Sequence, residues 1–132
     1  MRVKIYYHDT DAGNVVYYAN YLKYMEEART EFLEERGILL KDLARQGILF
    51  VVARQEIDYK APAFYADTLE ISAKLTSIST VKLEYEHEVK NQESRLICTG
   101  KAVLVCVSKD FKPQAIPEEV RKKLSQKPNA KI

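Results

Sequence analysis

Hydrophobic positions recur along this chain with two different periods, and their order predicts one long helix among several strands. Between residues 19 and 36 apolar side chains follow the three- and four-residue spacing of a helical stripe. The stripe consists of Tyr21, Met25, Ala28 and Phe32, and Leu22 and Leu33 widen it. Gly37 is a suitable stop for this helix. Shorter helices are expected at residues 40–46 and after Pro117, whose ring suits a first helical turn.

Alternation of apolar and polar residues predicts five strands. One strand, at residues 2–7, precedes the long helix, and four follow it, at residues 48–60, 67–76, 81–90 and 95–108. The clearest alternation places Val81, Leu83, Tyr85, His87 and Val89 on one face. His87 is therefore interpreted as a core or interface histidine. The first part of 48–60 is apolar on both faces, which predicts burial on both sides.

This order of elements predicts an α+β fold. One helical stripe and one sheet face must bury each other, and the simplest arrangement is a curved, mostly antiparallel sheet wrapped around the long helix. A length of 132 residues suits one domain, residues 1–132. A flexible tail is expected from about residue 125 to residue 132.

Composition and charge narrow the class of protein. With 21 basic and 19 acidic residues the chain is too balanced to favour nucleic acid as its main partner. No apolar run reaches the length of a bilayer span, and no signal region opens the chain, so we expect a cytoplasmic protein without membrane insertion. Basic residues near the end favour a solvated tail over a patch for ligand phosphates. They are Arg121, Lys122, Lys123, Lys127 and Lys131.

Cysteine and histidine usage gives no metal site. Cys98 and Cys106 stand eight residues apart in one predicted strand, which separates them by roughly 26 Å and prevents a disulfide within a straight strand. We interpret both as buried apolar residues. Two histidines without clustered cysteines provide no ligand set, so no metal is expected.

The segment between the first strand and the long helix holds the candidate chemistry. It places Asp9 and Asp11 in a turn just before a helix N-terminus, where backbone N–H groups lack partners and carry partial positive charge. A carboxylate beside such donors suits attack on a carbonyl. Gly13 and Asn14 suit positive φ angles in the turn. From the residues alone, Asp9 is a structural turn residue, and for Asp11 the residues modestly favour a purely structural turn acid over a catalytic one.

The turn Asp9-Thr10-Asp11-Ala12-Gly13-Asn14-Val15-Val16-Tyr17, the following Asn20-Tyr21 and the helical run from Tyr24 to Glu31 resemble the hotdog-fold thioesterases. The resemblance is strongest to the 4-hydroxybenzoyl-CoA thioesterase-like enzymes and the Tol-Pal-associated acyl-CoA thioesterases. It implies the hotdog fold and hydrolysis of a small acyl-CoA thioester to CoA and free acid. No cofactor is implied, because CoA is part of the substrate. A homodimer with a continuous sheet, commonly paired again into a homotetramer, is also implied, with the active site at the dimer interface.

Site residues follow from the same resemblance. Asp11 matches the catalytic carboxylate, either as nucleophile or as general base, and Tyr18 matches the position whose backbone N–H points at the thioester carbonyl. Tyr7 matches a tyrosine at a strand end close to the site. Substrate contacts are assigned to Gly13, Val15, Val16 and Tyr17. Tol-Pal-associated members usually carry a histidine at the place of Tyr18, whereas the 4-hydroxybenzoyl-CoA enzymes carry a tyrosine.

Two functions compete under this resemblance. The first is an acyl-CoA thioesterase, which Asp11 favours, because a binding protein needs no acid aimed at the carbonyl. The alternative is a non-catalytic hotdog module that binds an acyl-CoA or an acyl carrier protein. A hotdog dehydratase fits less well, since the chain has no hydratase-type histidine motif.

Overall fold

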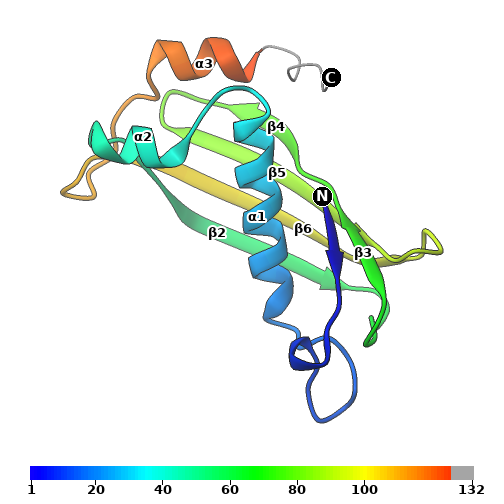
Figure 1. The fold of residues 1–132 in the computed structure, drawn as a ribbon. Coiled ribbons are helices and arrows are strands. Elements are labelled where there is room, and N and C mark those ends of the chain that lie inside the picture. Colours follow the sequence, from blue (N-terminus) through cyan, green and yellow to red (C-terminus); the bar gives the residue numbers. More distant parts are fainter. Residues whose placement is uncertain (126–132) are drawn as a thin grey trace.

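A long helix lies across one face of a six-stranded sheet in the computed structural model, which describes residues 1–125 (Figure 1). The helices are α1 (Asn20–Glu34), α2 (Leu40–Arg45) and α3 (Glu118–Leu124), and a 3-10 turn, η1, spans Tyr7–Asp9. The strands are β1 (Arg2–Lys4), β2 (Leu49–Tyr59), β3 (Thr68–Ile71), β4 (Lys74–Ile78), β5 (Lys82–Lys90) and β6 (Leu96–Val107). The predicted α+β arrangement of a curved sheet around one long helix is confirmed.

The sheet is antiparallel throughout its described pairs. Its strands follow the order β1-β3-β5-β6-β2, with β4 paired to β5 beside β3. The longest pairing joins β2 to β6, from Leu49 opposite Val107 to Tyr59 opposite Cys98. Because β2 stands last in this order, one of its edges faces no other strand of the described chain.

The core forms where α1 crosses the sheet. Met25 of α1 is fully buried and packs over β6 at Gly100, where an added Cβ would lie 2.6 Å from the Met25 sulfur. Glycine at this position therefore allows the close approach of helix and sheet. Gly37, with φ 76°, ends the helix as expected, and the N–H of Ile38 donates to the Leu33 carbonyl.

Two strands have other bounds in the structure than the sequence predicted. The strand expected at 67–76 divides at Ser72 and Ala73 into β3 and β4, because Ser72 turns its groups to β5: its N–H donates to the Glu88 carbonyl and its hydroxyl accepts from the Glu88 N–H. The strand expected at 2–7 ends at Lys4, because the chain turns into η1, where the N–H of Asp9 donates to the Tyr6 carbonyl.

Burial of the first part of β2 was predicted wrongly. Residues 48–51 are only half-buried, and Val52 remains 52% exposed. The physical reason is that β2 forms the edge of the sheet, so nothing in the described chain covers its outer side. The interpretation of the cysteines is confirmed, since Cys98 and Cys106 are both buried and free.

No described helix combines the length and the apolar character that a bilayer crossing demands. The tail expected from about residue 125 lies, apart from Ser125, outside the described residues.

Candidate active site

A tight hairpin between η1 and α1 presents the candidate residues at one end of the molecule. The Asp11 N–H donates to the Val15 carbonyl at 3.0 Å, and the Asn14 N–H donates to the Asp11 carbonyl at 2.9 Å. Asn14 takes the positive φ of 63° that the turn requires. Gly13 does not have a positive φ, so that expectation was wrong for Gly13 and correct for Asn14.

The Asp11 carboxylate is exposed and only half engaged. Its Oδ1 accepts the Gly13 N–H at 2.8 Å, and its Oδ2 has no partner within residues 1–125. A Cβ on residue 13 would lie 3.2 Å from Oδ1, so a glycine there leaves room for this contact. The pKa of the Tyr17 phenol is raised mainly by its neighbour Tyr18. The negative charge of Asp11 is the smallest of the contributions that raise it. One carboxylate oxygen is therefore held by the turn, while the other accepts no hydrogen bond from residues 1–125.

Asp9 is structural, as its position in the sequence suggested. Its Oδ2 accepts the Tyr6 N–H at 2.8 Å, which closes η1, and its carbonyl accepts from the Tyr17 N–H and the Asn20 amide. These bonds tie the start of α1 to the start of the hairpin. His8 is exposed and stacks on Tyr6, and its one polar contact within the described residues is with Asp9 at 3.7 Å.

The N-terminus of α1 offers a free donor next to this hairpin. α1 begins at Asn20, and no side chain caps it at Ala19. Within residues 1–125 the backbone N–H of Tyr18 has no acceptor, while the Tyr18 carbonyl accepts from the Tyr59 hydroxyl at 3.1 Å. Free N–H groups at a helix start carry partial positive charge and stabilise an oxyanion.

Aromatic side chains surround this end of the molecule and remain exposed. Tyr17 and Tyr18 are in ring contact at 4.9 Å, and Tyr59 lies edge-on to Tyr18 at 6.3 Å. Tyr18 is 61% exposed and Tyr59 is 50% exposed. Exposed apolar groups gathered in this way are typical of a surface that binds a ligand or another chain.

The other predicted contact residues occupy different environments. Val16 is buried and its N–H donates to the Ala63 carbonyl, whereas Val15 is half-buried and bridges to Phe64. Tyr7 does not lie at a strand end, because β1 stops at Lys4. Its exposed ring packs edge-on against Tyr65 at 5.9 Å, and no described contact joins it to Asp11.

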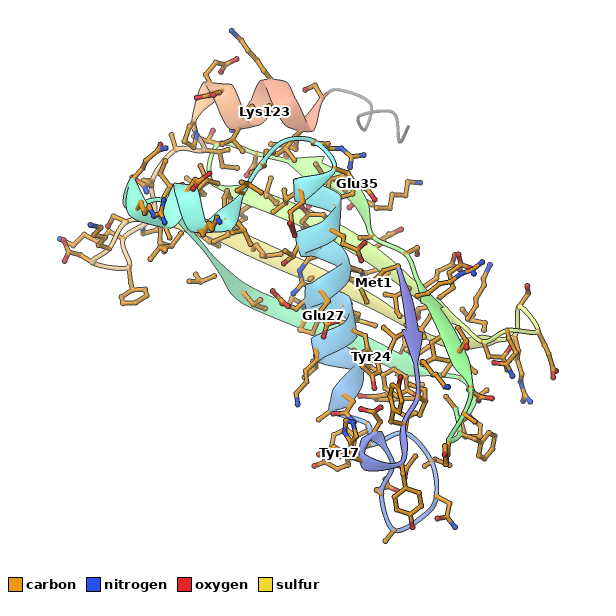
Figure 2. All side chains as sticks on the ribbon, viewed as in Figure 1. Met1, Tyr17, Tyr24, Glu27, Glu35 and Lys123 are labelled. Atoms are coloured by element: carbon orange, nitrogen blue, oxygen red, sulfur yellow. The ribbon has the colours of Figure 1, made fainter. Side chains whose placement is uncertain are left out.

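Basic residues of α3 lie at the opposite end of the molecule from the hairpin. Figure 2 shows Tyr17 and Lys123 at the two ends of the molecule. Arg121 donates to the Ser79 carbonyl, and Lys123 donates to the Gly37 carbonyl and pairs with Glu119. These contacts favour a structural role for the two cations. Lys127 and Lys131 lie outside the described residues.

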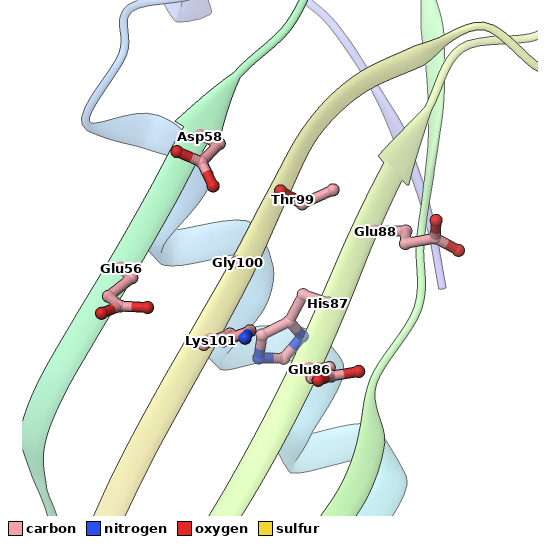
Figure 3. Close-up of a pocket in the computed structure, with 8 residues that line it drawn as sticks. All are labelled: Glu56, Asp58, Glu86, His87, Glu88, Thr99, Gly100 and Lys101. Carbon is pink, nitrogen blue, oxygen red and sulfur yellow. The ribbon is translucent and has the colours of Figure 1, made fainter.

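An acidic pocket on the exposed face of the sheet lies apart from this hairpin. It has a volume of about 360 Å³ and is lined by Glu56, Asp58, Glu86 and Glu88 around Lys101 (Figure 3). These strands lie in front of α1 in that view, so the pocket opens away from the helix. Arg54 pairs with Glu56 next to it, which indicates a solvated, ion-paired face. No cluster of residues able to hold a metal ion occurs in the described part of the chain.

Two buried polar residues were not identified as a pair by the sequence reasoning. Arg29 of α1 donates to His87 Nε2 at 3.1 Å, and His87 Nδ1 contacts the Ser72 carbonyl at 2.9 Å. Because a guanidinium only donates and a carbonyl only accepts, the His87 ring is neutral and carries its proton on Nδ1. Burial, with the Arg29 charge as a smaller cause, lowers the pKa of His87 to about 4. His87 is thus the core histidine that its alternating strand predicted.

Comparison with known proteins agrees with the fold. The model of the thioesterase-like superfamily matches residues 6–124. The acyl-CoA thioester hydrolase YbgC of Escherichia coli O6:H1 is 37% identical over 119 residues, which are 89% of each chain. The putative acyl-CoA thioesterase YneP of Bacillus subtilis is 31% identical over 84% of this chain and 81% of its own.

Solved structures give the same result. A gentisyl-coenzyme A thioesterase is similar with a TM-score of 0.86 and 30% identity, over 95% of this chain and 98% of the other. A DHNA-CoA thioesterase from Staphylococcus aureus is similar with a TM-score of 0.88 and 27% identity, over 94% and 88% of the two chains. Fold and sequence together define a hotdog hydrolase of the thioesterase class. The chain belongs to the thioesterase-like superfamily, and the resemblance seen in its sequence is confirmed.

Proposed function

We propose that this protein hydrolyses acyl-CoA thioesters and that Asp11 is its catalytic carboxylate. The observation that carries the proposal is the half-engaged Asp11 carboxylate, which lies in the hairpin just before the free Tyr18 N–H. The names of the relatives, which include acyl-CoA thioester hydrolases, support a CoA ester as the substrate.

The chemistry needs a polarised carbonyl, an attacking oxygen and a thiolate that leaves. In this proposal the Tyr18 N–H donates a hydrogen bond to the carbonyl oxygen and stabilises the negative charge that develops on it, a contribution typically worth about 10²–10³ in kcat for one such donor. In one route Asp11 attacks the carbonyl carbon, the C–S bond breaks to give a mixed anhydride, and a water then hydrolyses this anhydride and regenerates Asp11. In the other route Asp11 removes a proton from a water that attacks the carbonyl carbon, and the C–S bond then breaks. The thiolate leaves readily in both, because a thiol has a pKa of about 8.5. Either route consumes one water and releases the free acid and CoA, which takes up a proton as its thiol.

A homodimer completes the proposed site. β2 is a sheet edge of eleven residues with an exposed Val52, and an unpaired strand of this kind readily pairs with a second copy. Pairing two β2 strands would make one continuous sheet and would cover the exposed aromatic side chains near Tyr59. A pairing of dimers into a tetramer, and a cytoplasmic location, stay predictions.

Free thiol release from a panel of acyl-CoAs, from short aliphatic to aromatic, tests the proposed function. Turnover of at least one ester by the purified protein is the expected result. Tight binding of CoA esters with no thiol release from any of them would favour the non-catalytic binding module. Release only when the acyl group is carried on an acyl carrier protein would replace CoA as the thioester donor.

A further inference from the structure

A tight turn from Tyr17 to Asn20 leads from the hairpin into α1. The Asn20 N–H donates to the Tyr17 carbonyl at 2.9 Å, and this bond closes the turn. Ala19, the third residue, has φ −74° and ψ −18°, which lie near the values of a type I turn. Tyr18, whose N–H has no acceptor within residues 1–125, is therefore the second residue of a turn with a defined shape.

The closed turn restricts the peptide group that carries this N–H. The Tyr17 carbonyl and the Tyr18 N–H belong to one planar peptide group and point in opposite directions. Because the carbonyl oxygen accepts the Asn20 N–H, this group cannot rotate freely while the turn stays closed. The direction of the Tyr18 N–H is thus set from one side of the residue.

The side chain of Asn20 ties the same turn to the Asp11 hairpin. Its amide is partly buried and donates to the Asp9 carbonyl at 2.9 Å. That carbonyl also accepts the Tyr17 N–H at 2.9 Å. Since Asp9 stands two residues before Asp11, these bonds hold the free N–H and the carboxylate in one hydrogen-bonded unit.

Tyr59 holds the turn from the sheet. It is the last residue of β2, where it lies opposite Cys98 of β6, so its backbone is part of the sheet. Its hydroxyl donates to the Tyr18 carbonyl at 3.1 Å, and its ring lies edge-on to the Tyr18 ring. Partial burial is the main cause that raises the pKa of Tyr59, so the hydroxyl keeps its proton and can donate.

Tyr18 is therefore held on both sides of its Cα. The peptide group before it is fixed through the Tyr17 carbonyl, and the peptide group after it is fixed through the Tyr18 carbonyl that Tyr59 bonds. A residue has only two soft dihedral angles, so fixing both of its peptide groups fixes the direction of its N–H. A donor that needs no rearrangement stabilises an oxyanion at the moment of reaction.

We propose that Tyr59 and Asn20 are positioning residues of the thioester reaction, which keep the Tyr18 N–H directed at the substrate carbonyl. Neither side chain needs to touch the reacting atoms, because both act through the turn. This inference rests on the proposed function, since it assigns how the donor of the same reaction is held. Loss of either side-chain bond should lower kcat and leave KM nearly unchanged.

Tyr59→Phe removes the hydroxyl and keeps the ring. We expect kcat per folded protein on the best acyl-CoA of the panel to fall by about three- to tenfold, with KM within about twofold of the wild type. Thr76→Val is the matched control, because the Thr76 hydroxyl makes the same kind of exposed bond, 3.1 Å to the Glu84 carbonyl, on β4. β5 and β6 separate β4 from β2, so kcat should not change in this control.

Asn20→Ala removes the amide and keeps the backbone N–H that closes the turn. Alanine is the best helix former, so α1 should persist. We expect kcat to fall by about tenfold, again with little change in KM. Asn91→Ala is the control, since the Asn91 side chain also holds a turn, through the N–H groups of Glu93 and Arg95, between β5 and β6.

Infrared spectra of a bound thioester separate positioning from a purely structural role. The probes are acetyl-CoA and benzoyl-CoA, isotope-labelled at the thioester carbonyl and bound to an Asp11→Asn parent in which turnover is slow. A hydrogen bond from the Tyr18 N–H weakens the C=O bond and moves its band to lower wavenumber. Adding Tyr59→Phe to the parent should raise the wavenumber and broaden the band, whereas adding Thr76→Val should not.

Two results would overturn the inference. One is an active wild type whose kcat changes by less than about twofold in Tyr59→Phe or in Asn20→Ala. The other is a thioester band at the same position in the Asp11→Asn parent and in its Tyr59→Phe derivative. A band that depends on Tyr59 in a protein that hydrolyses no CoA ester would retain the positioning role and reject the proposed function.

Discussion

His87 makes the stability of the fold depend on pH at a single residue. Its pKa is about 4 in the folded chain, mainly because of burial, against 6.5 for an unperturbed histidine. Between these values the unfolded chain binds a proton that the folded chain does not, so stability falls as the pH drops from 6.5 towards 4. The free energy of unfolding falls by about 3 kcal/mol once the pH is below both values.

Urea unfolding of wild type and His87→Asn at pH 7 and pH 4.5 measures this effect. We expect the loss of stability between the two pH values to be smaller in His87→Asn. His8→Asn is the matched control, since the His8 side chain is 82% exposed and should leave the pH dependence unchanged. An equal pH dependence in wild type and His87→Asn would contradict the neutral, buried state of His87.

Tyr18 should act through its backbone and not through its hydroxyl. The N–H that lacks an acceptor belongs to the main chain, and the side chain of Tyr18 is exposed. We therefore expect Tyr18→Phe to keep kcat within about threefold of the wild type, well below the tenfold loss that 1.4 kcal/mol would cause. A loss of a hundredfold in thiol release would show that the phenol itself takes part.

The burial of individual residues was the property that the sequence predicted least well. The apolar stripe of the helix correctly indicated Met25 and Ala28, but Leu22 is 44% exposed, while Arg29 is buried. A stripe counted from apolar residues cannot include a guanidinium, whose burial depends on His87 from a distant strand. The Asp11 hairpin was accessible to prediction because its glycine, asparagine and carboxylate act within a few residues.

At the scale of elements, the packing of α1 on β6 depends on Gly100. We expect Gly100→Ala to lower the free energy of unfolding by about 1–3 kcal/mol, because the new methyl group would overlap the Met25 side chain. Chemical denaturation of Gly100→Ala, Met25→Ala and the double variant checks the cause. The two changes should cost less together than the sum of the single changes, whereas strict additivity would place the strain elsewhere.

Elements were predicted best where alternation or a stop signal was local. The alternation at 81–90 gave β5 within one residue, and Gly37 gave the end of α1. The break between β3 and β4 was missed because the apolar alternation continues through Ala73, while the bend follows from hydrogen bonds between Ser72 and β5. The exposure of β2 depends on strand order, which periodicity alone does not contain.

At the scale of the whole molecule, the free edge of β2 predicts self-association. We expect light scattering after size exclusion to show a dimer or a larger even oligomer for the wild type. Val52→Asp should shift the mass towards the monomer, because it places a charge at the proposed contact. Ser77→Asp is the control, since this exposed residue lies on β4, which β5 and β6 separate from β2. A wild type that is monomeric at high concentration would contradict the shared site.

The central claim is that Asp11 performs the thioester chemistry, and the rate of thiol release by wild type and Asp11→Asn tests it most directly. Asparagine keeps an oxygen that can accept the Gly13 N–H, so the hairpin should persist. We expect turnover of the best acyl-CoA to fall by at least about 10²-fold. Glu88→Gln, which changes an exposed acid on the inner strand β5, should retain full activity. Near wild-type turnover by a folded Asp11→Asn variant would contradict the account.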